Sequence, residues 1–234
     1  MTVGLSELVL ILLAIILSSI HLNSKTLSKI IEDDFMHWLS FAAASLLATV
    51  FLIFLPHVVE GDPDHVIYPL MLAGFAVFFL SEKYLYQHVK DEKTLEEDLY
   101  HLHIFGFFID HSIKGFILVT IVGLRPVVGF LTFIPFFIHT VASTIALESF
   151  HKISGSDLDR YVLSSSVLIG VLSGIFLDIG EDIERGILAF TLGILMFLVS
   201  RDILPKEGEG RPRYFILGMA TIFTLWLMLE FLLL

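Results

Sequence analysis

Long uninterrupted apolar runs restrict what this chain can fold into more than any other feature. Of its 234 residues 56% are hydrophobic and only 17% are charged, and the charged residues cluster between the apolar runs. Each run can supply the ~20 residues that cross a bilayer core. Backbone polar groups in lipid need partners within their own segment, so such runs form helices. The sequence therefore predicts an all-α, polytopic membrane protein.

Eight membrane-spanning helices are predicted, joined by short polar connections. The first apolar run has no basic segment before it, so we interpret it as a true helix and not as a cleaved signal. No connection could hold a soluble domain, and residues 1–234 are therefore expected to form a single membrane domain. The predicted helices cover about residues 4–21, 35–57, 66–88, 99–123, 127–149, 160–178, 185–202 and 213–233.

Basic residues predict the orientation in the membrane. With the N-terminus outside, only Arg125 and Arg185 fall in outer loops, and Lys114 lies within the fourth helix. Lys and Arg are enriched in cytoplasmic loops. We therefore expect an integral protein of the cell membrane with both termini outside. The remaining basic residues all fall on the inner side: Lys25, Lys29, Lys83, Lys90, Lys93, Lys152, Arg160, Arg201, Lys206, Arg211 and Arg213.

Composition excludes several classes of function. The chain has no cysteine, so disulfides, thiolate metal sites and cysteine nucleophiles are excluded. The net charge is −11 and few basic residues lie outside the inner loops, so nucleic acid is not an expected partner. The lipid bilayer is the expected partner, and a homodimer is left open. Gly170 and Gly174 form a small-xxx-small pattern that allows close helix contact.

The fourth predicted helix carries ionisable residues that lipid contact does not explain. Such residues within a span usually face a protein interior or a water-filled path. His103, Asp110 and Lys114 follow one another at spacings of seven and four residues, which places them on one helical face, and His111 lies beside it.

The fifth predicted helix adds His139, Thr140, Ser143 and Thr144. A tight turn joins it to the fourth helix, so the two should be antiparallel neighbours. Asp110 and His139 both lie near mid-membrane and could then face each other.

Two interpretations of these residues remain open. Imidazole nitrogen and carboxylate oxygen suit zinc and similar divalent ions, and hydroxyls suit harder ions. A cation site would then comprise Asp110, His139, His103 and Ser143. The alternative is an ion pair between Asp110 and Lys114 within one helix, supported by hydroxyl groups that hydrogen-bond between helices.

Several segments resemble the ZIP (Zrt/Irt-like) family of divalent metal transporters in their order and spacing. The second helix ends Phe54-Leu-Pro-His-Val-Val-Glu60, which is similar to the family's LLPEALE ending. The third contains Gly74-Phe-Ala-Val-Phe-Phe-Leu-Ser-Glu-Lys-Tyr84, similar to GFLLFFLLEK, and the seventh ends Val199-Ser-Arg-Asp-Ile-Leu-Pro-Lys-Glu207, similar to LLPE. The resemblance implies eight helices, outer termini and transport of a divalent metal.

The metal-binding motifs of that family are incomplete here. The resemblance implies His-Asn-x-x-Asp/Glu in the fourth helix and His-Glu/Asp-x-x-Glu/His in the fifth. The aligned residues are Gly106, Phe107 and Asp110 in the fourth helix and His139, Thr140 and Ser143 in the fifth. At most one weaker site is implied, formed by Asp110 and His139 with help from hydroxyls or His103.

Three functions follow as hypotheses. The first is a ZIP-like carrier whose cargo is a divalent, zinc-like cation and which has no resident cofactor. The second is a ZIP-like scaffold that has lost metal transport, in which Lys114 is a built-in cation and the protein acts as a regulatory or partner subunit or carries another solute. The third, an intramembrane metal-dependent hydrolase, is disfavoured because the paired-histidine spacing of such enzymes is absent, so we expect no enzymatic activity.

Overall fold

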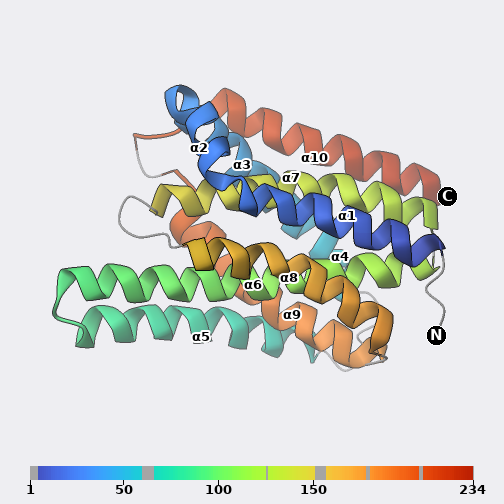
Figure 1. Ribbon diagram of the computed structural model, residues 1–234, viewed down its shortest axis with the longest axis horizontal. Helices are drawn as coiled ribbons and strands as arrows, with labels where there is room; N and C mark the ends of the chain where they lie inside the picture. Colours follow the sequence, from blue (N-terminus) through green and yellow to red (C-terminus); the bar gives the residue numbers. More distant parts are fainter. Residues whose placement is uncertain are drawn as a thin grey trace.

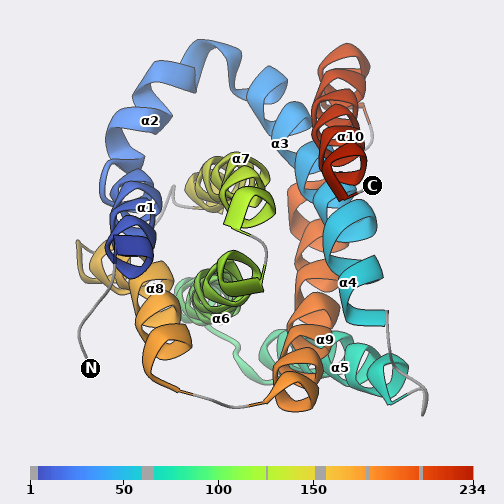
Figure 2. The same ribbon diagram turned by 90° about the vertical axis from the view of Figure 1, so that its right-hand side faces the viewer.

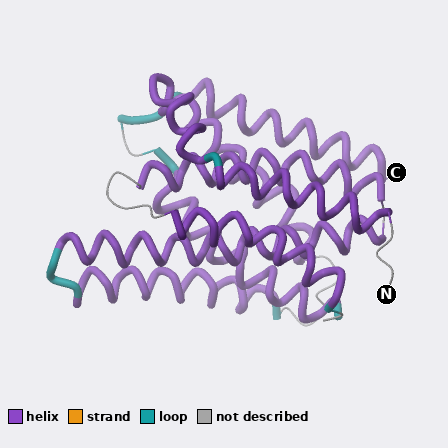
Figure 3. Tube along the Cα trace, viewed as in Figure 1, coloured by secondary structure: helices purple, strands orange, loops and turns teal. Residues whose placement is uncertain are grey.

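The computed structural model describes residues 5–59, 66–124, 126–150, 157–177, 180–205 and 208–233, and within them it contains helices and no strand (Figure 3). The all-α prediction is therefore confirmed for the described part of the chain. The elements are α1 (Leu5–Leu22), α2 (Ser24–Ile31), η1 (Glu32–Asp34), α3 (Phe35–Thr49), η2 (Val50–Phe54), α4 (Leu55–Val59), α5 (Ile67–His88), α6 (Glu92–Leu124), α7 (Pro126–Phe150), α8 (Asp157–Phe176), α9 (Glu181–Leu198), η3 (Val199–Ile203) and α10 (Pro212–Leu233).

Six helical stretches among the described residues are long and apolar enough to cross a membrane. Their length and composition indicate an integral membrane protein in contact with lipid. Helices α5 and α7 lie alongside them in the bundle (Figure 1), but do not belong to this set. The six stretches are Leu5–Leu22, Phe35–Phe54, Glu92–Val119, Asp157–Phe176, Asp182–Arg201 and Pro212–Phe231.

The charged stretch between the predicted helices 66–88 and 99–123 mostly belongs to the start of α6. Oδ2 of Asp91 accepts hydrogen bonds from the Thr94 hydroxyl at 2.7 Å and the Thr94 backbone amide at 2.9 Å, which caps the helix. These bonds lower the pKa of the Asp91 carboxyl below its ordinary value, and the bond from the Thr94 hydroxyl contributes most. Helices α5 and α6 therefore extend together beyond one end of the bundle (Figure 1). The connection between the predicted helices 4–21 and 35–57 is likewise mostly helical, as α2 and η1.

Two π-helical segments, which are wider than an α-helix, follow directly after α3 and α9. They cover Val50–Phe54 and Val199–Ile203, and each comes directly before a Leu-Pro pair, Leu55-Pro56 and Leu204-Pro205. Proline has no backbone N–H to donate and its ring disturbs the preceding turn, which favours a local change of helical pitch. Such π-turns frequently mark functional segments.

Helices α6 and α7 occupy the middle of the bundle, and the other long helices surround them (Figure 2). Helix α6 packs on α8 and α9, whereas α7 packs on α1 and α3. The outer helices pair as α5 with α9, α3 with α10 and α1 with α8. These packed pairs form a symmetric set. The set stays the same when α1 is exchanged with α8, α3 with α9, α5 with α10 and α6 with α7. The exchanged helices run in opposite directions (Figure 1), as in an inverted repeat.

Candidate functional site

The two central helices bring together the two residues on which the cation-site prediction depends. Oδ2 of Asp110, on α6, lies 3.2 Å from Nε2 of His139, on α7. Both side chains are buried, with 3% and 0% of their residue surfaces exposed. Helices α6 and α7 pack directly against each other. The predicted juxtaposition of Asp110 and His139 in the protein interior is thus confirmed.

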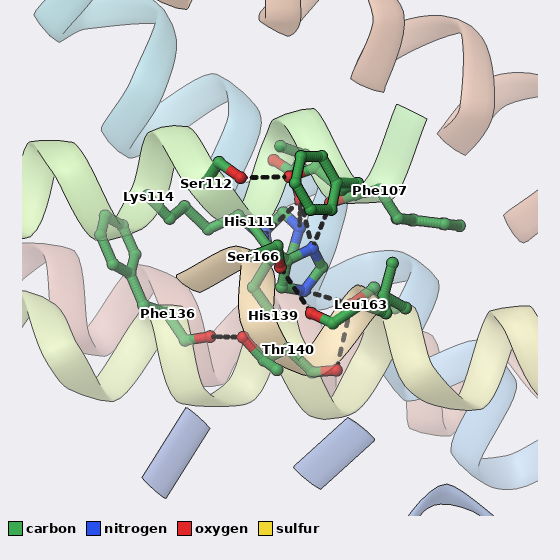
Figure 4. Close-up of polar contacts among 12 residues, drawn as sticks. Phe107, His111, Ser112, Lys114, Phe136, His139, Thr140, Leu163 and Ser166 are labelled. Carbon is green, nitrogen blue, oxygen red and sulfur yellow. Dashed lines mark hydrogen bonds and ion pairs between the residues drawn. The ribbon is translucent and has the colours of Figure 1, made fainter. Parts of the chain in front are cut away.

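Three nitrogen atoms surround the same carboxylate oxygen. Nζ of Lys114 lies 2.5 Å from Asp110 Oδ2, as an ion pair without the alignment of a hydrogen bond, and Nδ1 of His111 lies 3.4 Å from it. His139 Nε2 is the third. The alternative prediction, an Asp110–Lys114 ion pair, is therefore also confirmed. Figure 4 shows Lys114 one turn along α6 from His111, with His139 opposite.

Burial makes this ion pair energetically important. Moving an isolated carboxylate or ammonium into an apolar interior costs far more than burying a neutral polar group. Lys114 is 2% exposed and Asp110 is 3% exposed, so bulk water screens neither charge. The attraction at short range offsets their desolvation, and removing one partner leaves an uncompensated buried charge. Lys114 thus occupies the position on Asp110 where a bound cation would lie.

Ser143, predicted as a ligand, contacts His111 and not the Asp110–His139 pair. His111 Nδ1 lies 2.7 Å from the Phe107 carbonyl oxygen, so we assign Nδ1 as the protonated nitrogen and Nε2 as the acceptor. Ser143 Oγ lies 3.1 Å from His111 Nε2 and 3.0 Å from the Thr140 carbonyl oxygen. The Ser143 hydroxyl has one hydrogen, which it donates either to His111 Nε2 or to the Thr140 carbonyl, and it contacts the imidazole from α7.

His103, the fourth predicted ligand, lies apart from these residues. It is buried, and its Nδ1 contacts the Leu99 carbonyl oxygen of its own helix at 2.5 Å. Seven residues separate it from Asp110, which is about 10 Å along a helix axis. Within the described ranges no group of three His, Cys, Asp or Glu side chains is arranged to hold a metal ion. The arrangement thus offers a two-residue centre with His111 beside it.

His21, on α1, is a member of this polar cluster that the sequence analysis did not predict. Its Nδ1 lies 2.9 Å from Oγ1 of Thr144, and its ring centroid lies 4.6 Å from that of His111. It is 2% exposed. A signal was present, because the buried residues of α1 recur at helical spacing and His21 is the last of them: Leu10, Ala14, Leu17 and His21.

A cavity of about 10 Å³ lies beside the charged pair, which is room for a single water molecule. Asp110, Lys114 and Phe54 form part of its wall, together with Thr191 of α9. Phe54 is the last residue of the π-turn η2. The charged pair therefore lies next to both a small void and an irregular helix segment.

A scan against protein-family models gives no match, and a search of curated proteins finds no match.

Proposed function

We propose that this chain is a ZIP-like membrane carrier of a divalent, zinc-like cation, with Asp110 and His139 as the transport site. One observation carries the proposal: a buried carboxylate oxygen at the centre of the bundle is surrounded by two imidazole nitrogens and one ammonium nitrogen. Intramembrane ionisable residues of this kind mark ion and substrate pathways. Carboxylate and neutral imidazole are also ligands that zinc accepts.

The arrangement of the helices supports this proposal. In the proposed topology, α5 and α7 cross the membrane together with the six apolar stretches, which makes eight crossings with both termini outside. The start of α1 and the end of α10 lie at the same end of the bundle (Figure 1), as an even number of crossings requires. Inverted repeats permit alternating access because one half can rock against the other around a central site. The π-turns η2 and η3 are related by this repeat and provide places for such bending.

Lys114 acts in this proposal as a tethered counter-ion. In the resting state its ammonium neutralises Asp110. An entering cation must displace Nζ, because two cations on one carboxylate repel strongly in a medium of low dielectric constant. The four-carbon stem of lysine is flexible enough to move Nζ away. When Lys114 returns to Asp110 it competes with the bound ion and favours its release.

A second function is supported by a separate observation. Asp110 already has a cationic partner, and the described residues contain no three-ligand group. If Lys114 never leaves, the protein is a ZIP-like scaffold without metal transport that serves as a regulatory or partner subunit or carries another solute. Wild-type protein would then neither transport nor bind divalent cations.

Uptake of Zn²⁺ into proteoliposomes tests the proposal. The double variant Asp110→Asn/Lys114→Met removes the carboxylate without stranding a buried charge, and His139→Ala removes the second ligand. Each should lower the uptake rate at least about tenfold, since mutating residues that only support metal ligands already lowers metal affinity or activity about 10–100-fold. His101→Ala is a matched control, because His101 is an exposed histidine on the same helix and should leave uptake unchanged.

Two outcomes would contradict the transport proposal. One is wild-type uptake no faster than that of protein-free vesicles, which favours the scaffold. The other is uptake that persists at the wild-type rate in both site variants. Circular dichroism and gel filtration of each variant would show that its fold and dispersion are retained.

A further inference from the structure

An apolar groove of about 510 Å³ runs between α10 and the irregular segment that continues α3. These two helices lie side by side at the outside of the bundle (Figure 2), so the groove opens towards the surrounding membrane. Its volume falls in the range of ~300–1,000 Å³ that is typical of sites for small organic ligands. Every residue of its wall is apolar, and the wall includes Phe51, Leu52, Ile216, Met219, Ala220 and Phe223.

The groove occupies one half of the membrane. Helix α10 crosses it as Pro212–Phe231 and begins at the side that the basic residues predict as cytoplasmic. Phe223 is ten residues from Arg213, which is about 15 Å along the helix axis and half of a hydrocarbon core of ~30 Å. Trp38 and Tyr214, near the starts of α3 and α10, are exposed aromatic residues of the kind enriched at the membrane–water interface. The groove therefore has the depth of one acyl chain of the inner leaflet.

An unpaired basic side chain lies at the interfacial end of this groove. Arg213 and Ala220 are seven residues apart, which places them on one face of α10. Arg213 is exposed, and no ion pair within the described part of the chain includes it. The carboxylate of Asp34, which precedes α3, contacts Nδ1 of His37 at 2.8 Å instead. A guanidinium group binds phosphate oxygens in a bidentate manner, so the groove leads to a cation at the level of lipid phosphates.

A second copy of this chain is a poorer match for the groove than a lipid. Helices associate within membranes through small residues that allow close approach. The groove presents large exposed side chains instead, among them Phe51, Ile216 and Phe223. Gly218, the small residue of α10, already faces α3, where a Cβ would lie 2.4 Å from the Phe41 carbonyl oxygen. A two-fold dimer through this face would also bring two copies of Arg213 to the same membrane depth, where they repel.

We propose that the groove binds one phospholipid of the inner leaflet, with an acyl chain between Phe51 and Phe223 and its phosphate on Arg213. This binding does not depend on the proposed transport function. Phe51 belongs to the π-turn η2, and Phe54 at the end of η2 borders the small cavity beside Asp110 and Lys114. A bound acyl chain therefore packs against the irregular segment next to the central charged pair, and should stabilise it.

Native mass spectrometry of delipidated protein, titrated in detergent with phosphatidylglycerol, tests the phosphate contact. The wild type should retain one lipid tightly, and Arg213→Gln should weaken its binding about fivefold, since a basic residue near the membrane surface contributes about that much. Lys83→Gln is the matched control, because Lys83 is an exposed cation of α5 on the same predicted side and should leave binding unchanged. Diacylglycerol with the same chains has no phosphate, so Arg213→Gln should not alter its binding. Equal phosphatidylglycerol binding by the wild type and Arg213→Gln would overturn the phosphate contact.

Filling the groove tests the position of the acyl chain. Ala220→Trp places an indole in the groove from an exposed position and should abolish the tightly retained lipid. Val77→Trp is the matched control, since Val77 is an exposed residue of α5 outside the groove and its replacement should leave the lipid bound. Retention of the lipid by a folded Ala220→Trp protein would overturn the proposal. A dimer that dissociates on Ala220→Trp without losing lipid would assign the groove to a second copy instead.

Discussion

Replacing Lys114 with methionine should lower the free energy of unfolding by about 3–5 kcal/mol, because the change strands the Asp110 carboxylate in the bundle centre. The Lys114 side chain is fully enclosed and its Nζ lies 2.5 Å from Asp110. Methionine has a similar volume, so little of the loss should come from a cavity. Thermal or denaturant unfolding in detergent, followed by circular dichroism, measures the change.

Two comparisons isolate the charge effect. Asp110→Asn/Lys114→Met should recover most of the lost stability, since replacing both partners of a buried pair is often nearly neutral. Lys93→Met breaks an exposed pair with Glu97, whose N–O distance is 3.8 Å, and should cost less than about 1 kcal/mol. Equal effects of Lys114→Met and Lys93→Met would show that Lys114 does not neutralise a buried carboxylate.

The same variant tests whether Lys114 stands in for a cation. Zn²⁺ should stabilise Lys114→Met more than the wild-type protein, because the ion no longer competes with Nζ for Asp110. Saturation at 100 times Kd contributes about 2.7 kcal/mol. A zinc response no larger than that of the wild type would exclude the idea that Lys114 blocks a latent cation site.

Much of the central site could be predicted because helix geometry links spacing to position. Asp110 and Lys114 are four residues apart, so they lie on one face of α6 wherever that helix packs. The short connection in the sequence predicts that α6 and α7 are neighbours, which brings His139 to Asp110. Neither inference needs knowledge of the other helices, and both agree with the structure.

The contributions of more distant helices could not be predicted in the same way. His21 lies on α1 more than a hundred residues before Thr144, and only the packing of α1 against α7 and α8 brings them together. Ser143 lies on the same face of α7 as His139, as predicted. It is one helical turn away from His139, however, and there it contacts His111 and not Asp110. The helical start of α6 was missed because the predicted helix begins at about residue 99, with the apolar run, whereas the Asp91 cap starts a solvated helix before it.

The position of the site also depends on how closely α6 approaches α8. Gly170 on α8 is therefore expected to be sensitive to substitution. A Cβ atom at Gly170 would lie 1.8 Å from the Ser112 carbonyl oxygen, and one at Gly115 would lie 2.3 Å from the Val167 carbonyl oxygen. These atoms belong to backbone, so a side chain can be accommodated only if the helices move apart. Ser112 is two residues from Asp110, and the movement would therefore also displace the site.

Gly170→Ala should consequently destabilise the protein by about 2–3 kcal/mol, near the upper end for overpacking in a rigid core. Gly186→Ala is the matched control on α9, because its Cβ would meet only the flexible end of Leu70, at 3.4 Å. There the gain in helix propensity should prevail, and stability should rise by about 0.5–1 kcal/mol. The same substitution thus has opposite expected signs at two helical glycines. Unfolding in detergent distinguishes them, and a Gly170→Ala protein as stable as the wild type would mean that α6 and α8 do not approach closely enough to hold Asp110 in place.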